Sequence, residues 1–316
     1  MEKVLVDHDR MFKELLTTFF TDFLDLFFPT LAAELDRNSL EFLSQELYPD
    51  RLKEKAYRAD LLVKARFRHQ VACFLVHVEH QSTAPPSFPE RFYRYYSAIS
   101  ARHGLPVYPI VIYSHDKPRA KQPSVHRVSF LDGEVLRFRY RVVQLNRLPW
   151  RRFLQVRNPV ASALMSKMRI AERDRPRVKL ECLRLMLTLR LDPARTWLIS
   201  SFVDAYLQLS AAENERFLRE AETGEFDPAE REEIVEYITT WERKGRELGL
   251  AEGRQEGLQA GAAALRGVLL DVLASRFGKV DPAVRQKLER IDSLPKLQKL
   301  IHKALTAKSP AALRLG

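Results

Sequence analysis

The stretch that most constrains the fold is 71–79, VACFLVHVE, which is apolar at almost every position. A strand with one solvated face alternates apolar and polar residues, whereas a strand covered on both faces does not. The run therefore predicts a central strand between two layers. Residues 57–67, YRADLLVKARF, predict a neighbouring strand, and Arg68-His69-Gln70 a short turn between the two. We expect the two strands to pair antiparallel through this turn.

Helical spacing of apolar side chains over residues 9–28 predicts a helix, with Asp9 as its N-cap and Pro29 after its end. The helix is rich in phenylalanine, so we expect it to pack on the sheet. The same patterns predict three further elements: a helix over 88–103 ended by Gly104, a strand over 107–113 that contains an awkward Pro109, and a hairpin over 125–145 that turns at Asp132-Gly133.

From about residue 160 the pattern is helical, with helices predicted over 177–191 and 197–209, a turn at Thr223-Gly224 and a new helix near Asp227-Pro228. Glycine then recurs every four residues from 245 to 261. Such a stripe indicates a helix that another helix approaches closely, in the same chain or in a second copy; the alternative is a flexible linker. We expect three parts: 1–225, a connector over 226–263, and a small helical domain over 264–316.

Charge is distributed unevenly along the chain, although the formal net charge is only +11. Residues 51–200 carry 30 basic and 11 acidic side chains, net +19, whereas 1–50 and 201–250 are each net −7 and 251–316 is net +6. A basic block of this size is typical of proteins that bind a polyanion, most often nucleic acid. An arginine-rich surface that is simply solvated is the alternative, and charge alone does not separate the two.

The rest of the composition limits the class of protein and the compartment that we expect. An apolar fraction of 46% excludes global disorder, and no run approaches the roughly 18 apolar residues of a membrane span. The N-terminus, MEKVLVDHDR, lacks the apolar stretch of a signal peptide. Cys73 and Cys182 each lie among apolar neighbours, so we expect two buried thiols in a reducing cytoplasm and no cysteine-based metal site.

Two carboxylates and an amide are expected at one end of the first strand pair. Asp60 opens the first strand, and Glu79 and Gln81, which share a face, close the second. Pairing about the turn sets position 60 opposite position 78, next to Glu79. Adjacent carboxylates repel each other unless a cation neutralises them, and Mg²⁺ favours one or two carboxylates together with waters and phosphate oxygens. The alternative is that both acids merely end strands.

The string Val78-Glu79-His80-Gln81-Ser82-Thr83, with Asp60 upstream, resembles the Rpn family of recombination-promoting nucleases, also labelled transposases, in the PD-(D/E)XK nuclease superfamily. The likeness covers most of the chain. It extends to His8-Asp9 and Phe12-Lys13, to Arg91-Phe92-Tyr93-Arg94-Tyr95, to Val107–Tyr113, and to the glycine stripe and Arg276-Phe277-Gly278. The resemblance implies an α/β fold with a restriction-endonuclease-like core, a mixed central sheet flanked by helices with 39–48 as its first strand, followed by an all-α C-terminal region.

The resemblance also implies the roles of the site residues. Asp60 and Glu79 would be metal ligands, and Gln81 would take the position that is lysine in the wider superfamily. Glutamine orients water by hydrogen bonding but has no useful proton equilibrium, so the general base stays open between a metal-bound hydroxide and a substrate phosphate. Four cations are weaker candidates for nucleic-acid contacts, each with an ordinary surface role as the alternative: Lys13, Lys64, Arg91 and Arg94.

The resulting hypothesis is a cytoplasmic, Mg²⁺-dependent DNA endonuclease that hydrolyses phosphodiester bonds and promotes recombination or mobile-element activity. Other divalent cations stay open as cofactors, and 1–225 would be the nuclease domain. The expected partners are DNA and, through 245–261, a second copy of the chain, with no membrane. The rival hypothesis is a non-catalytic DNA-binding or oligomerising protein that keeps the nuclease fold; the intact Asp60, Glu79 and Gln81 argue against it.

Overall fold

The chain was analysed as a computed structural model. It describes residues 7–43, 61–68, 70–79, 87–224, 226–278, 280–307, 309 and 313, with positions 78, 79, 242, 244–252, 256 and 283 described by their backbone alone. The chain divides into two compact units, Met1–Val235 and Glu236–Gly316. Each unit has a hydrophobic core of its own and is described separately below.

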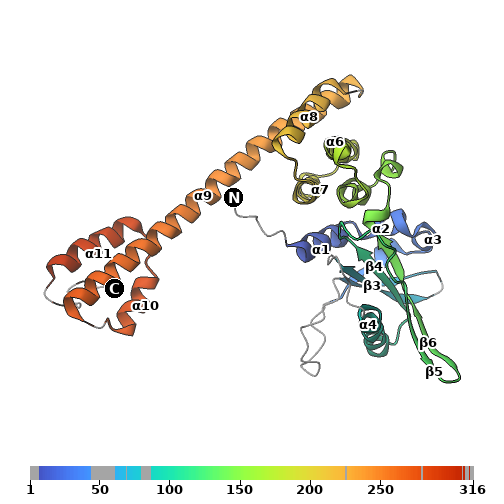
Figure 1. The fold of residues 1–316 in the computed structure, drawn as a ribbon, viewed down its shortest axis with the longest axis horizontal. Coiled ribbons are helices and arrows are strands. Elements are labelled where there is room, and N and C mark those ends of the chain that lie inside the picture. Colours follow the sequence, from blue (N-terminus) through green and yellow to red (C-terminus); the bar gives the residue numbers. More distant parts are fainter. Residues whose placement is uncertain are drawn as a thin grey trace. The chain divides into compact units, whose positions relative to one another are not determined.

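The N-terminal unit is built on a mixed five-stranded sheet, as the sequence predicts (Figure 1). Its strand order is β1-β2-β3-β4-β7. The strands are β1 Glu41–Phe42, β2 Leu61–Arg66, β3 Val71–Glu79, β4 Val107–Tyr113 and β7 Arg141–Gln144. The first three pair antiparallel, and β3, β4 and β7 run parallel. The near-continuous apolar run of β3 therefore lies between two paired neighbours, which confirms its central place.

Helices cover both faces of this sheet (Figure 1). On one face, α4 (Phe88–His103) packs Phe88 and Phe92 into a cluster that includes Leu75 of β3. On the other face lie α1 (His8–Thr18), α2 (Phe20–Phe27) and α3 (Pro29–Ala32). There the rings of Phe20 and Phe74 meet edge to face at 5.4 Å between centroids. The single helix predicted over 9–28 is wrong in its continuity, because it is interrupted at Phe19, but its packing on the sheet is confirmed.

The bounds of α4 and β4 agree with the sequence prediction. Gly104 ends α4 in the left-handed region with φ of 60°, a conformation that glycine adopts without strain. Pro109 is tolerated inside β4 because the ladder to β7 begins one residue later, at Ile110. At Pro109 the strand is paired only with Leu75 of β3, so the missing N–H interrupts no bond to β7.

Two local predictions near the sheet are wrong by one or two residues. Asp7, not Asp9, caps α1, because its carboxylate accepts the backbone N–H of Arg10 at 3.1 Å. In the β2–β3 pair, Leu61 lies opposite Val76 rather than the expected His77. The reason is that Gln70, which the sequence placed in the turn, pairs with Phe67: the Phe67 N–H donates to the Gln70 carbonyl at 2.7 Å, so Val71 lies opposite Arg66 instead of Phe67.

The predicted hairpin over 125–145 forms as β5 (Val125–Phe130) and β6 (Gly133–Arg139), with Gly133 at φ of 153° in the turn. The sequence prediction treated the whole range 125–145 as one hairpin. Arg141–Gln144 leaves the hairpin and joins the main sheet as β7. Tyr140, between the two, is buried, and it anchors the junction against Phe92.

Helices complete the N-terminal unit after the sheet. They are α5 Pro159–Leu164, α6 Arg175–Thr188, α7 Pro193–Tyr206 and α8 Ala211–Thr223, with short 3₁₀ turns at Leu145–Arg147, Trp150–Phe153, Met165–Lys167 and Glu172–Asp174. Phe202 of α7 packs edge to face on Phe12 of α1 at 5.0 Å between ring centroids. The helices predicted over 177–191 and 197–209 and the turn at Thr223-Gly224 are confirmed.

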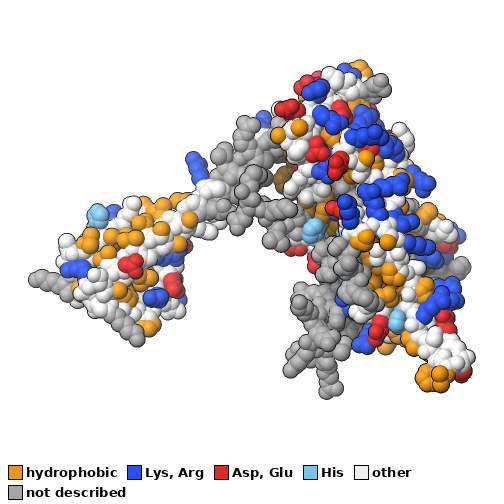
Figure 2. Space-filling model, viewed as in Figure 1, with side chains coloured by type: hydrophobic (Ala, Val, Ile, Leu, Met, Phe, Trp, Pro, Cys, Tyr) orange, Lys and Arg blue, Asp and Glu red, His pale blue; other side chains and the backbone are white. Residues whose placement is uncertain are grey.

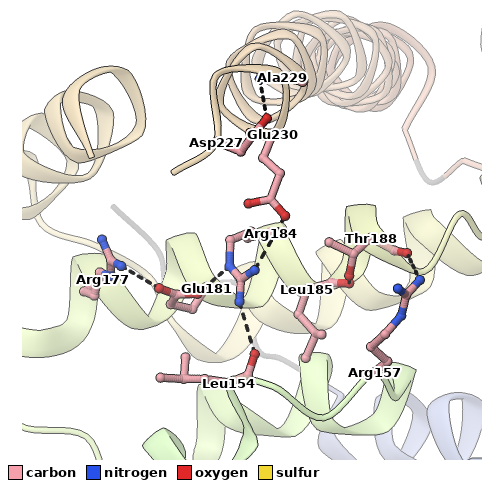
Figure 3. A network of polar contacts seen from close by, with 10 residues as sticks. All are labelled: Leu154, Arg157, Arg177, Glu181, Arg184, Leu185, Thr188, Asp227, Ala229 and Glu230. Carbon is pink, nitrogen blue, oxygen red and sulfur yellow. Dashed lines mark hydrogen bonds and ion pairs between the residues drawn. The ribbon is translucent and has the colours of Figure 1, made fainter. Parts of the chain in front are cut away.

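A buried carboxylate holds several of these helices together (Figure 3). The Glu181 side chain is 5% exposed and pairs with both Arg177 and Arg184 at 2.7 Å. Arg184 also donates to the Leu154 carbonyl at 3.1 Å and approaches Glu230 at 3.8 Å. Arg184, paired with Glu181, thereby joins α6 to the turn before α5 and to the start of α9 (Pro228–Phe277).

The glycine stripe lies inside α9, which is helical throughout 228–277, so the linker alternative is wrong. In the C-terminal unit, the last part of α9 packs with α10 (Pro282–Glu289) and α11 (Leu294–Thr306). A Cβ added at Gly261 would lie 3.3 Å from Leu294 of α11, whereas one added at Gly253 or Gly257 would meet nothing within 4 Å. The same chain thus supplies the close neighbour at Gly261.

One part of α9, Gly253–Phe277, is long and apolar enough to cross a membrane by length and composition, which the sequence analysis did not expect. Core helices of water-soluble domains pass the same test. Three apolar side chains of this stretch, Ala262, Leu269 and Leu273, are buried in the core of the C-terminal unit. Packing against α10 and α11 therefore explains part of the apolar character of this stretch.

Candidate active site

The parallel strands end together at one edge of the sheet. The ladder sets Glu79 of β3 beside Tyr113 of β4, and Tyr113 beside Gln144 of β7. Since β2 runs antiparallel to β3, it starts at this same edge, with Leu61 opposite Val76, three residues before Glu79. The end of β3 and the beginning of β2 therefore meet at the edge where loops following β4 and β7 also begin.

The three residues expected to carry the chemistry are described unequally. Glu79 is the last residue of β3, and its backbone lies at the strand-end edge. Asp60 and Gln81 lie outside the described residues, as does the side chain of Glu79. Asp60 directly precedes Leu61, the first residue of β2, in the sequence. That the two acids lie together at one edge stays a prediction.

The loop after β4 is held in place by side chains that follow β7. Gln144 accepts the N–H of Gln122 at 3.1 Å through its amide oxygen and donates to the Ala120 carbonyl at 2.8 Å. Asn146 donates to the Pro118 carbonyl at 3.0 Å, across the cis Lys117-Pro118 bond. Both amides are buried and bonded to each other at 3.0 Å. The loop wall of the site is therefore fixed by a buried polar cluster.

A second set of contacts links this loop to the first helix. The Lys167 ammonium lies 2.8 Å from a carboxylate oxygen of Asp116, three residues after β4. It also lies 5.0 Å from the ring centroid of Tyr206, over its face. The Tyr206 hydroxyl is 2.9 Å from Nδ1 of His8, at the start of α1. We refer to Asp116, Lys167, Tyr206 and His8 as the edge relay.

Burial keeps the Tyr206 hydroxyl of the edge relay protonated. Burial raises the pKa of the Tyr206 hydroxyl well above its usual range, and the nearby charges of Asp9 and Asp7 raise it further. Tyr206 is therefore a neutral hydrogen-bonding group at physiological pH. It serves as a fixed partner for His8 and as an aromatic face for Lys167, not as a proton carrier.

The four cations singled out from the sequence fall in different places. Arg91 lies over the Phe88 ring at 5.3 Å, and Phe88 in turn contacts Tyr113 of the strand-end edge. Arg94 pairs with Glu90, one helical turn earlier in α4, at 2.6 Å. Lys13 is on the exposed side of α1. Arg91 is thus connected to the strand-end edge through the Phe88 ring.

Lys64 is not brought to this edge. It lies opposite Cys73, six residues before Glu79, which is about 20 Å along a strand at roughly 3.3 Å per residue. Its ammonium pairs with Glu41 of β1 at 3.2 Å. Positions 60 and 64 of one strand share a face of the sheet, but four residues along a strand separate them by about 13 Å. A shared face therefore does not imply that Lys64 is close to position 60.

His77 of β3 packs among aromatic rings. Its ring is stacked on Phe88 at 5.5 Å and lies 6.2 Å from Phe92, in the layer between β3 and α4. Among the residues that the structure describes, no group of three or more His, Cys, Asp or Glu side chains could hold a metal ion. Asp60 and the side chain of Glu79 lie outside the residues to which this statement applies.

Residues 6–189 match the family described as "Putative transposase, YhgA-like", which is more than half of the 316-residue chain. The chain belongs to the YhgA-like transposase family. No curated protein and no solved structure matches it. The YhgA-like segment contains Asp60, Glu79 and Gln81, the whole five-stranded sheet and Lys167, but it ends before Tyr206. The expected relation to the Rpn and transposase group is thus confirmed at the level of the family.

Sequence reasoning missed most of the edge relay. Asp116 carried a usable signal, because it closely follows a predicted parallel strand, and ligand sites of α/β sheets lie beyond the carboxyl ends of strands. Lys167 and Tyr206 carried none. They come from helical segments 51 and 90 residues further along, and only the packing of those segments brings them to Asp116 and His8.

Proposed function

We propose that this chain is a divalent-metal-dependent DNA endonuclease that hydrolyses phosphodiester bonds and so promotes recombination or mobile-element activity. The observation that carries the proposal is the strand-end edge, where β3 ends at Glu79 beside the start of β2. Membership of a transposase family supports action on DNA. The basic surface supports it too: Figure 2 shows Lys and Arg side chains gathered on the visible face of the N-terminal unit.

The donor set at this edge fits a hard cation. Asp60 and Glu79 offer carboxylate oxygens and Gln81 an amide oxygen, the ligand types that Mg²⁺ prefers. Both cysteines are buried in cores, Cys73 in the middle of the sheet and Cys182 in α6, so no thiolate competes for the site. When bound, Mg²⁺ would lower the pKa of a water and stabilise charge on the attacked phosphate.

The chain's own residues would position the substrate. Gln81 would orient the attacking water by hydrogen bonding, since its amide has no useful proton equilibrium. Arg91, near the edge, would hold a neighbouring phosphate by a charge-assisted bond. The buried Gln144–Asn146 cluster would keep the loop after β4 in one conformation, so that the strand-end edge stays open to a DNA strand.

The test is cleavage of supercoiled plasmid by the full chain with Mg²⁺, Mn²⁺, Ca²⁺ or EDTA. We expect nicking with Mg²⁺ that EDTA abolishes. Asp60→Asn and Glu79→Gln should each reduce the rate by at least about 100-fold, because each removes a charge from the metal-binding pair. The matched control is Glu41→Gln, which neutralises an exposed acid on the neighbouring β1 that pairs with Lys64.

Two outcomes would overturn the proposal. A wild-type chain that cuts no DNA with any of these ions, yet binds it, would favour the non-catalytic DNA-binding alternative. Cleavage that survives Asp60→Asn and Glu79→Gln unchanged would exclude the strand-end edge as its site. As parts of the same proposal, we place the enzyme in the cytoplasm and assign self-association to the glycine stripe over 245–261. Self-association is tested by measuring the mass of the chain in solution for the wild type, Gly253→Leu and Gly257→Leu.

A further inference from the structure

We propose that the β5–β6 hairpin is a DNA-binding ribbon whose apolar tip, Phe130-Leu131, inserts between base pairs while three arginines on one face contact phosphates. This inference rests on the proposed function, because it assumes that duplex DNA is the partner. It assigns a second contact surface, separate from the strand-end edge. Figure 1 shows the hairpin extending from the sheet with its turn directed away from the body of the N-terminal unit.

The first observation is how the hairpin is anchored. Near its base, Phe138 is only 6% exposed and packs against Tyr96 of α4 at 4.8 Å between ring centroids. His126, directly opposite Phe138, stacks on Tyr93 at 5.7 Å. One face of the ribbon is thus fixed to α4 at its base. The residues beyond it, toward the turn, are almost all exposed.

The second observation is the other face. Directly opposed residues of an antiparallel pair point to the same side. Arg127 lies opposite Arg137, and Val125 opposite Arg139, so all three arginines share the face turned away from α4. Like charges in direct opposition destabilise a strand pair. Here Glu134 compensates only in part, at 3.6 Å from Arg127 and 3.0 Å from Arg137.

The third observation is the tip. Phe130 is 71% exposed and Leu131 is 99% exposed, the most exposed large apolar side chains in the described part of the chain. Val135, on the returning strand beside the bulge at Val128/Ser129, is 64% exposed. A packed core gains nothing from apolar side chains placed there. Their burial against a partner would contribute roughly 25 cal/mol per Å².

Charge and shape together favour duplex DNA as the partner. Residues 117–141 carry seven basic and two acidic side chains. A two-stranded ribbon, with strands about 4.8 Å apart, fits a groove of duplex DNA. Proteins that bind the minor groove insert apolar wedges such as Phe or Leu between base steps, and cations beside the wedge neutralise the phosphates. An arginine face that leads to an apolar tip matches this arrangement.

The experiment measures DNA binding by the full chain in EDTA, so that no cleavage is needed. The duplex carries 2-aminopurine, which fluoresces more strongly when its base is unstacked, at different positions in a set of oligonucleotides. We expect the wild type to raise this fluorescence at one or more positions. The variant Phe130→Ser/Leu131→Ser should lose the rise and bind about tenfold more weakly. Its circular dichroism should be unchanged, because both side chains are exposed.

The arginine face is tested by salt dependence. Replacing Arg127, Arg137 and Arg139 by glutamine should reduce the slope of log K against log salt by about 2.7, at roughly 0.9 for each phosphate that the variant no longer neutralises. The matched control is Leu305→Ser, which changes an apolar residue 53% exposed on α11 of the C-terminal unit. It should alter neither the fluorescence nor the salt slope.

Failure of this inference is distinguishable from failure of the nuclease proposal. A wild type that unstacks DNA but cuts none with Mg²⁺ overturns the nuclease and leaves the ribbon standing. A wild type that cuts DNA, with affinity and fluorescence unaffected by the tip variant, overturns the ribbon alone. The ribbon is also overturned if the tip variant changes only chain mass in solution or binding to anionic vesicles, since the tip would then contact a second copy or a membrane.

Discussion

The ion pair between Asp116 and Lys167 predicts an asymmetric response to mutation. The Lys167 side chain is 9% exposed, whereas that of Asp116 is 84% exposed. Removing the acid therefore leaves an ammonium with little water to replace its partner. Removing the lysine leaves a carboxylate that is already hydrated. The two variants break the same contact but should not cost the same free energy of unfolding.

The magnitudes follow from the surroundings. Deleting one partner of a fully buried pair typically costs about 3–5 kcal/mol, and the cost is lower here because Asp116 is exposed and Lys167 would keep its contact with the Tyr206 ring. We expect Asp116→Ala to lower the free energy of unfolding by about 2 kcal/mol. Lys167→Met keeps most of the apolar stem and removes the buried charge, so we expect a loss of about 0–1 kcal/mol.

The assay is urea unfolding of the full chain at neutral pH, followed by tryptophan fluorescence, with Asp116→Asn as a control that keeps a neutral acceptor for the ammonium. Asp116→Asn should fall between the other two variants. The reasoning is refuted if Lys167→Met costs as much as Asp116→Ala or more. That result would mean that the ammonium is well solvated, or that the pair acts as a buried unit from both sides.

Three further predictions concern other parts of the N-terminal unit. Glu181→Ala leaves Arg177 and Arg184 without their shared carboxylate, so the free energy of unfolding should fall by about 3 kcal/mol in the same urea assay; Glu181→Gln should cost less. Burial raises the pKa of Tyr140 to about 12, so the folded state holds this proton more tightly than the unfolded chain does. The free energy of unfolding should therefore be unaffected below about pH 10 and should decrease between about pH 10 and 12. In Tyr140→Phe this decrease should be smaller by about 2–3 kcal/mol. Asn146→Ala releases the Pro118 carbonyl, so tryptic cleavage after Arg119 should become faster, whereas an unchanged cleavage pattern would show that the loop is held by other contacts.

The elements that sequence could predict are those defined by local signals. The helix over 88–103 ends at a glycine in the left-handed region, and β4 is a short apolar run between turn residues, so both bounds agree with the structure. The two-residue β1 carries almost no pattern, and only its pairing with Lys64 and Val63 identifies it as a strand. Local composition thus located most elements of the sheet and the antiparallel β2–β3 pair, but not the register of that pair.

The register and the site geometry depended on contacts that local patterns do not show. The one-residue error in the β2–β3 register arose because Phe67 pairs with Gln70, which the sequence placed in the turn. Asp60 and Glu79 could be proposed from strand order and family likeness. The edge relay could not, because Lys167 and Tyr206 look like ordinary residues of helical segments until those segments pack on α1 and the loop after β4.

The contact of α7 with α1 has a consequence for where the family segment can be cut. The recognisable similarity stops at residue 189, yet Phe12 and His8, inside it, are covered by Phe202 and Tyr206, outside it. A protein trimmed to the similar region would expose the fully buried Phe12 ring, a loss of about 1.5–3 kcal/mol for that side chain alone. The unit that folds is longer than the unit that similarity detects, and relatives cut at that border would be studied without part of their own core.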